Sequence, residues 1–314
     1  RGRRLVSRLF IMLQMYQALR PSSTQFVPVR NLQYHVHTWG QPNALPPLVM
    51  VHGWMDVGAS FQFVVDALRQ DRYVIAPDWR GYGLTSNAGA DNYWFPDYLA
   101  DLDFLLDALL PGQVVDLLGH SMGGNVVMLY AGARPERIRR LINLEGFGMP
   151  DTRPAQAPSR YARWMDELKA MHKGEMNLRP YDSVDDVAKR LMKNNARLGQ
   201  DKADWLARHW ARPNAQRQWE IAGDAAHKVV NAQLFRLEEV LESYRRISAP
   251  TLVVEASDNE MGKWYQGKYT LDEFHERLKA VPKLAVEKLA DCGHMLHHDQ
   301  PAALARVIEG FLAG

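Results

Sequence analysis

The 314-residue sequence contains only one cysteine, Cys292. One cysteine cannot build an internal disulfide framework or a cysteine-rich zinc site. This scarcity fits a reducing compartment, and we expect a cytoplasmic protein. The sequence also lacks a P-loop, a dinucleotide-binding fingerprint and an H-E-x-x-H motif. The motifs therefore imply no cofactor and no metal.

Long apolar runs and an excess of charge are missing as well. No stretch of 18 uncharged apolar residues occurs, so no membrane span is expected. The formal net charge is only +2, and Arg1, Arg3, Arg4 and Arg8 supply more than that excess. The remainder of the chain is slightly acidic, which argues against a nucleic-acid partner.

The first 24 residues are read as a leading segment. Their basic start followed by an apolar stretch resembles a signal peptide, but Arg8, Gln14 and Gln17 interrupt the stretch. No small-residue cleavage site follows. We expect either an amphipathic helix or residues added outside the natural chain.

Short apolar runs then alternate with stretches of helical spacing. Buried runs predict strands within 26–30, 32–40, 45–53, 72–78, 114–121, 140–146, 250–257 and 283–291. Apolar positions at helical spacing predict helices at 58–69, 93–109, 122–133 and 271–281, and a closing helix through Phe311. Strands that are apolar on both faces and alternate with helices indicate an α/β fold, with a doubly wound, mostly parallel sheet.

This alternation stops between residues 149 and 246. Strand-like runs disappear there, helical runs dominate, and four tryptophans cluster. We expect residues 25–148 and 247–314 to form the core and residues 149–246 to form a helical cap over the carboxyl ends of the strands, where open α/β sheets bind their ligands. The tryptophans, together with Tyr161, Met165 and Trp54, suggest an apolar or aromatic pocket, although each one singly is expected to hold the cap to the sheet.

The strongest chemical signal is GHSMGG at 119–124. It follows an apolar strand and opens a helix, which is the setting of a nucleophile elbow. Gly119 and Gly123 remove side chains that would collide with the strand and the helix, and Ser121 is presented at the helix amino terminus. A serine hydroxyl becomes a nucleophile when a base removes its proton. We therefore expect a histidine and a carboxylate to follow.

Four motifs in order make the chain similar to the α/β-hydrolase superfamily. They are VHGW at 51–54, PDWRGYGLTS at 77–86, GHSMGG at 119–124 and DCGHMLHHDQP at 291–301. The resemblance covers residues 25–313 and is weakest in the cap. It is to the capped branch that contains esterases, haloalkane dehalogenases and epoxide hydrolases.

The resemblance implies an oxyanion hole made by the backbone N–H groups of Trp54 and Met122. It also implies a triad in the order serine, acid, histidine, with His294 as the base. His297 and His298 enter the closing helix and are expected to be solvated or to face the cap.

The triad acid has two candidate positions in this superfamily. Glu145 ends the strand after the nucleophile helix and resembles the acid of dehalogenases that use glutamate there. Asp258 follows the strand after the cap, one residue before the position used by many relatives. Glu145 is favoured because an ionised carboxylate at the end of a buried strand is costly unless it is paired. Asp258 remains the alternative.

Other reactive residue types are interpreted as structural. Asp78 is expected to form a turn with Arg80 nearby, and Asp56 and Asp116 to sit in turns or at strand ends. Cys292 is expected to be a packed side chain, since nothing in the sequence beside it lowers the pKa of its thiol.

Serine in place of the aspartate nucleophile argues against dehalogenase and epoxide hydrolase chemistry. We expect a serine esterase that acts on a carboxylic ester, thioester or lactone of an apolar or aromatic small molecule. Perhydrolases and C–C bond hydrolases use the same triad and remain alternatives. A non-catalytic small-molecule receptor on this fold is the alternative from another class.

Overall fold

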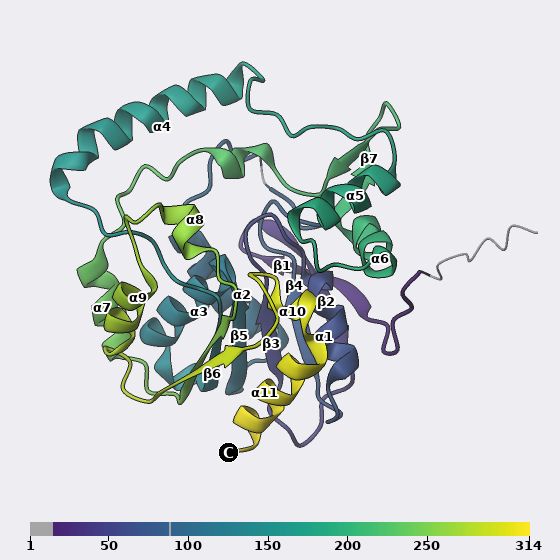
Figure 1. The fold of residues 1–314 in the computed structure, drawn as a ribbon, viewed down its shortest axis with the longest axis vertical. Coiled ribbons are helices and arrows are strands. Elements are labelled where there is room, and N and C mark those ends of the chain that lie inside the picture. Colours follow the sequence, from purple (N-terminus) through teal and green to yellow (C-terminus); the bar gives the residue numbers. More distant parts are fainter. Residues whose placement is uncertain (1–14, 88) are drawn as a thin grey trace, which may run out of the picture.

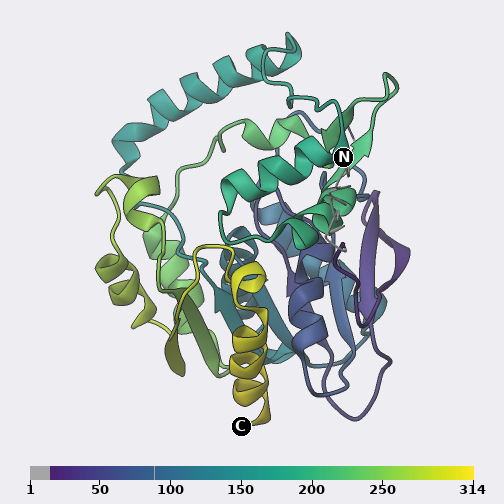
Figure 2. The same cartoon turned by 45° about the vertical axis from the view of Figure 1, so that its right-hand side comes forward.

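A computed structural model describes residues 15–87 and 89–314. Within them, eight strands form one sheet in the order β1-β2-β4-β3-β5-β6-β9-β10 (Figures 1 and 2). The strands are β1 (Ser23–Val29), β2 (Leu32–Trp39), β3 (Leu48–Val51), β4 (Val74–Pro77), β5 (Val115–His120), β6 (Ile138–Leu144), β9 (Thr251–Ala256) and β10 (Leu284–Leu289). Among these strands, β2 pairs antiparallel with β1 and with β4, and all other neighbouring strands pair parallel. The predicted α/β fold with a mostly parallel sheet is confirmed.

Alternate residues of the central strands point to two separate apolar cores. Leu48 and Met50 of β3 pack in one core, and Val49 and Val51 pack in the other. Helices α1 (Gln62–Ala67) and α11 (Pro301–Ala313) cover the first face. The second face is covered by α2 (Pro96–Leu109), α3 (Met122–Ala133), α7 (Leu237–Arg245) and α9 (Leu271–Leu278). Helices on both faces explain why β3, β4 and β5 are buried along their whole length.

The segment between β6 and β9 holds α4 (Ala157–His172), α5 (Val184–Asn194) and α6 (Gln200–Trp210), followed by α7. Helices α5 and α6 share a small apolar core with Phe63 of α1. Helix α4 spans one end of the molecule (Figure 1), and none of its residues is buried.

The expectation that this segment lacks strands is wrong. Strands β7 (Ala211–Pro213) and β8 (Trp219–Ile221) pair antiparallel there. Each is only three residues long, so neither produces an alternation that the sequence could reveal.

The predicted leading helix is not found in the part of the leading segment that the structure describes. Residues 15–22 are not helical, and β1 begins at Ser23. The Tyr16 ring packs edge-on against Phe63 and Trp205, and its hydroxyl donates to Asp66. Residues 15–22 therefore tie α6 to α1. Residues 1–14 lie outside the described residues.

Two short helices near the site complete the fold. Helix α8 (Met261–Tyr265) follows β9, and α10 (Leu296–Asp299) follows β10. Across the part of the chain that the structure describes, no helix combines the length and apolarity needed to cross a membrane.

The elbow glycines lie against neighbouring backbone. A Cβ on Gly123 would sit 2.4 Å from the Val51 carbonyl oxygen and 2.6 Å from that of His52. Both atoms belong to the backbone and cannot rotate away. Helix α3 can pack this close to β3 only because residue 123 has no side chain.

We expect Gly123→Ala to lower the free energy of unfolding by about 1–3 kcal/mol, the usual cost of overpacking. Gly310→Ala is the matched control, because Gly310 lies in α11 with open space around its Cα. That substitution should stabilise by about 0.5–1 kcal/mol through helix propensity. Urea unfolding of both variants measures the difference; equal effects would contradict the packing argument.

Candidate active site

Ser121 lies at the turn between β5 and α3. Its backbone has φ 54° and ψ −117°, a conformation that serine rarely adopts. The Ser121 N–H donates to the Leu144 carbonyl at 2.8 Å, which anchors the turn to the end of β6. A Cβ on Gly119 would lie 2.2 Å from the Gly123 carbonyl oxygen. These close contacts hold the serine in its strained conformation.

Three loop residues meet at the carboxyl ends of the strands. His294 Nε2 lies 2.9 Å from Ser121 Oγ, and His294 Nδ1 lies 3.2 Å from a Glu145 carboxylate oxygen. If Nδ1–H donates to the carboxylate, Nε2 is left as the acceptor for the serine hydroxyl. The structure thus brings together the serine, histidine and glutamate singled out by the sequence.

Glu145 is almost completely buried, with 1% of its surface exposed. Its second carboxylate oxygen accepts the Ala256 N–H at 2.6 Å, and its backbone has a φ of 56°. Burial raises the pKa of Glu145, while the contacts with His294 and the Ala256 N–H oppose that rise. The partners that the buried carboxylate requires are therefore an imidazole and a backbone amide.

The other candidate acid does not meet His294. The Asp258 carboxylate pairs with Arg197, and its side chain is 59% exposed. Its backbone N–H donates to the Cys292 carbonyl at 3.0 Å, so only its main chain lies beside the histidine loop.

The amides expected to form the oxyanion hole flank Ser121. Met122 is the first residue of α3, directly after the serine. Gly53 approaches so closely that a Cβ there would lie 3.0 Å from Ser121 Cβ, which brings the following Trp54 amide to the same region. Within residues 15–87 and 89–314, no protein acceptor is recorded for either N–H. Both amides are positioned as candidate donors to a ligand.

The expectation that His297 and His298 are solvated is wrong, whereas His298 does lie beside the cap, against Phe63 and within reach of Lys202 of α6. Both are buried, with 0% and 4% exposure, and both contact the Ser60 hydroxyl. The one-turn helix α10 turns them into the protein, an orientation that neighbouring histidines in a sequence do not reveal. Cys292 is also buried, and burial raises the pKa of its thiol, as expected of a packed side chain.

Asp78 and Asp116 are structural, as expected. Asp78 accepts the Gly58 N–H and helps to form its turn, and buried Asp116 pairs with Arg72. Arg80 does not contact Asp78; it pairs with Asp101. Asp56 is buried as well, and its Oδ2 lies 3.7 Å from His297 Nε2.

Two residues near the triad were missed by the sequence reasoning. His120 Nε2 lies 2.8 Å from the His294 carbonyl oxygen and supports the backbone of that loop. Its place just before the serine in GHSMGG was the available signal. The Trp264 ring on α8 packs edge-on against the His294 imidazole, 4.4 Å between centroids. No motif marks Trp264.

A serine at a strained strand-to-helix turn, an imidazole and a buried carboxylate, set on this sheet, define the class of α/β hydrolases with a serine at the nucleophile position. A family model described as the alpha/beta hydrolase fold matches residues 46–301. The chain belongs to this family, and the comparisons support a hydrolase.

Similar proteins align over almost the whole chain. A "Serine hydrolase-like protein" of Danio rerio is 24% identical, over 94% of this chain and 90% of its own length. A "Cis-3-alkyl-4-alkyloxetan-2-one decarboxylase" of Shewanella oneidensis is 25% identical, over 95% of this chain and 91% of its own. Among solved structures, a thioesterase domain from the curacin biosynthetic pathway aligns with a TM-score of 0.79 at 24% identity, over 92% of this chain and 99% of that domain. At this identity the structural likeness shows the fold alone.

Because the pKa of Glu145 is raised, we predict that this residue lowers the free energy of unfolding by an amount that depends on pH. Between the unfolded and the higher folded pKa, the native state binds more protons, so stability falls as pH rises through that interval. Glu145→Gln removes this cost. We expect the Glu145→Gln variant to have a higher urea midpoint than wild type at pH 7.5. The difference between the two midpoints should become smaller as the pH is lowered toward 4.5. A variant less stable than wild type at pH 7.5 would show instead that pairing with His294 outweighs burial.

Proposed function

We propose that the protein is a serine hydrolase that cleaves a carboxylic ester, thioester or lactone of an apolar small molecule through an acyl-enzyme. The observation that carries the proposal is the contact of His294 Nε2 with Ser121 Oγ at 2.9 Å, with Glu145 on the other ring nitrogen. The sequence order serine, acid, histidine is the order used in this fold.

Acylation follows from these contacts. His294 Nε2 takes the hydroxyl proton as Ser121 Oγ attacks the carbonyl carbon. The carbonyl oxygen becomes negative and accepts the N–H groups of Trp54 and Met122. The imidazolium then gives its proton to the departing oxygen or sulfur, which leaves an ester on Ser121.

Deacylation repeats the steps with water. His294 takes a proton from water, the hydroxide attacks the acyl carbon, and the proton returns to Ser121 Oγ. Glu145 stabilises the imidazolium in both halves and keeps Nδ1 protonated. Each turnover consumes one water; an ester or thioester releases one acid and one alcohol or thiol, and a lactone releases one hydroxy acid.

The surroundings of the triad favour an apolar substrate. Trp264 touches His294, and Trp54 and Met149 expose about half of their surfaces near the same loops. The name of the Shewanella relative denotes an oxetan-2-one, which is a strained cyclic ester. β-Lactones therefore belong in a substrate panel beside nitrophenyl esters and thioesters.

We expect a fluorophosphonate probe to label wild-type protein and to leave Ser121→Ala unlabelled, because only an activated serine attacks the probe. Wild type should also hydrolyse short nitrophenyl esters, and Ser121→Ala should fall to the background rate. Mass spectrometry of the labelled peptide and steady-state rates are the measurements. Tight binding of a small molecule that survives Ser121→Ala, without turnover across the panel, would favour the receptor alternative.

If Glu145 is the triad acid, Glu145→Gln should lower kcat by a factor on the order of 10⁴, the scale seen when such an acid is removed from another triad. Asp258→Asn should cost less than about tenfold, because its carboxylate pairs with Arg197 and not with His294. Both single variants and the double variant form a cycle that reveals compensation. Loss of activity in Asp258→Asn alone would reverse the assignment.

A further inference from the structure

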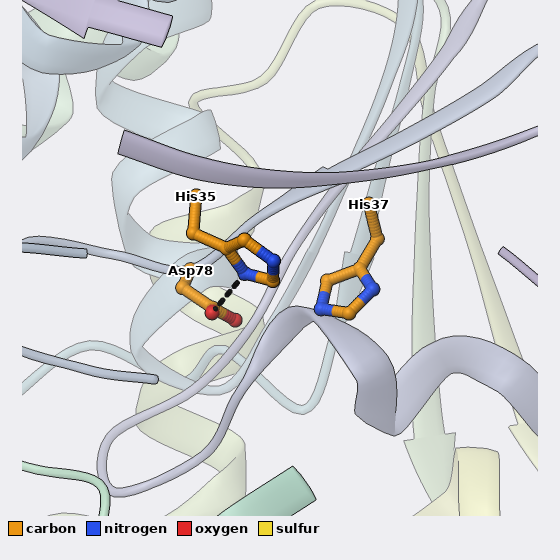
Figure 3. Close-up of side chains that lie close together, drawn as sticks. All are labelled: His35, His37 and Asp78. Atoms are coloured by element: carbon orange, nitrogen blue, oxygen red, sulfur yellow. Dashed lines mark hydrogen bonds and ion pairs between the residues drawn. The ribbon is translucent and has the colours of Figure 1, made fainter. Parts of the chain in front are cut away.

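Two groups of buried histidines and a carboxylate bring potential metal ligands within 4.8 Å of one another among the described residues. Figure 3 shows the first, His35, His37 and Asp78. There, one Asp78 oxygen accepts the Gly58 N–H at 2.7 Å, and the other accepts the Leu84 N–H and faces His35 Nδ1 at 2.8 Å. Each oxygen of the Asp78 carboxylate already has a hydrogen-bond partner, so this group does not need a cation to satisfy the carboxylate.

The second group is Asp56, His297 and His298, gathered around the Ser60 hydroxyl. His297 Nε2 lies 3.1 Å and His298 Nε2 lies 2.6 Å from Ser60 Oγ. His297 Nε2 also lies 3.7 Å from Asp56 Oδ2. At most 4% of any of these four residues is exposed.

Two buried polar atoms of this group lack a hydrogen-bond partner. Asp56 Oδ1 accepts both the Val57 N–H and the Trp210 indole N–H, each at 2.8 Å, but the buried Oδ2 has no partner. The Ser60 hydroxyl has one proton, so it donates to one of the two Nε2 atoms and can only accept from the other. His297 Nδ1 is buried without a partner as well.

Burial makes these missing partners costly. Asp56 Oδ2 and His297 Nδ1 are shut off from water and have no hydrogen-bond partner, and the nearest imidazole nitrogen to Oδ2, His297 Nε2, lies 3.7 Å away. A buried carboxylate oxygen without a hydrogen-bond donor is costly, and a cation held between this oxygen and the imidazole nitrogens would offset that cost.

We propose that Asp56, His297 and His298, with Ser60 as a fourth oxygen donor, form a binding site for a divalent transition-metal ion of the Zn²⁺ type. Two imidazoles and a carboxylate are a usual Zn²⁺ donor set. Four converging donors suit its tetrahedral preference. The site is separate from Ser121, His294 and Glu145, and it stands whether or not the proposed esterase activity is found.

The ligands come from two chain segments, 56–60 and 297–298, which follow Trp54 and His294 in the sequence. Asp56 lies two residues after Trp54, and Ser60 lies in the adjoining 3₁₀ helix η1 (Gly58–Phe61). His297 lies three residues after His294, in α10. A bound ion would therefore fasten the turn that carries the Trp54 amide to the loop that carries His294.

The test titrates Zn²⁺ and Co²⁺ into chelator-treated protein. We expect one ion per chain by calorimetry, visible Co²⁺ absorption bands of a tetrahedral site, and a Zn²⁺-dependent rise in Tm, because an ion bound only by the native state stabilises it. Asp56→Asn and His297→Gln should each weaken Zn²⁺ binding at least tenfold. His298→Gln serves in place of either variant that does not give a folded circular dichroism spectrum.

Two further variants separate this site from the alternatives. His37→Gln, in the group of Figure 3, and His294→Gln, at the triad, should both retain the ion and the Co²⁺ bands. The proposal is overturned if wild type binds no ion, if Asp56→Asn and His297→Gln bind as wild type does, or if binding disappears in His37→Gln or His294→Gln.

Discussion

The candidate site depends on the close approach of α3 to β3 at the elbow. Gly123 lies where a side chain would meet the carbonyl oxygens of Val51 and His52, and Gly119 lies where one would meet the Gly123 carbonyl. This packing keeps Ser121 in its strained conformation and brings the residue after His52 against it. The serine and the two candidate oxyanion amides are consequently parts of one rigid contact, held by the apolar packing of β3 and β5.

Burial decides the charges around that contact. The pKa values of His52 and His120 are lowered chiefly because both rings are buried, so these imidazoles are neutral at physiological pH. His120 then donates from Nε2 to the His294 carbonyl, and His52 accepts the Trp79 N–H. Neutral neighbours support the loops without adding positive charge that would compete with an imidazolium at His294. The same burial makes an ionised Glu145 carboxylate costly, and its contact with His294 offsets part of that cost.

The features that the sequence predicted correctly arise from local patterns. The strands around Ser121 are unbroken apolar runs, and a glycine-flanked serine between strand and helix has few structural alternatives. Glu145 could be favoured because a carboxylate at the end of a buried strand needs a partner. The errors concern contacts between distant segments. Nothing local in HMLHH shows that α10 turns His297 toward Ser60, which lies 237 residues earlier in the chain. Strands of three residues, such as β7, are too short to show an alternation of apolar and polar side chains.

The segment between β6 and β9 is joined to the site through two indole groups. Trp210, at the end of α6, donates to Asp56, and Trp54 donates to the His227 carbonyl at 3.3 Å. Both bonds end on the stretch 54–56, which also carries the Trp54 amide. Helix α6 is fixed further by Trp205 against Tyr16 and Phe63, whereas α4 buries none of its residues. Helix α4 is therefore held to the rest of the molecule by less buried contact than α6, whose displacement would strain the turn that carries the Trp54 amide.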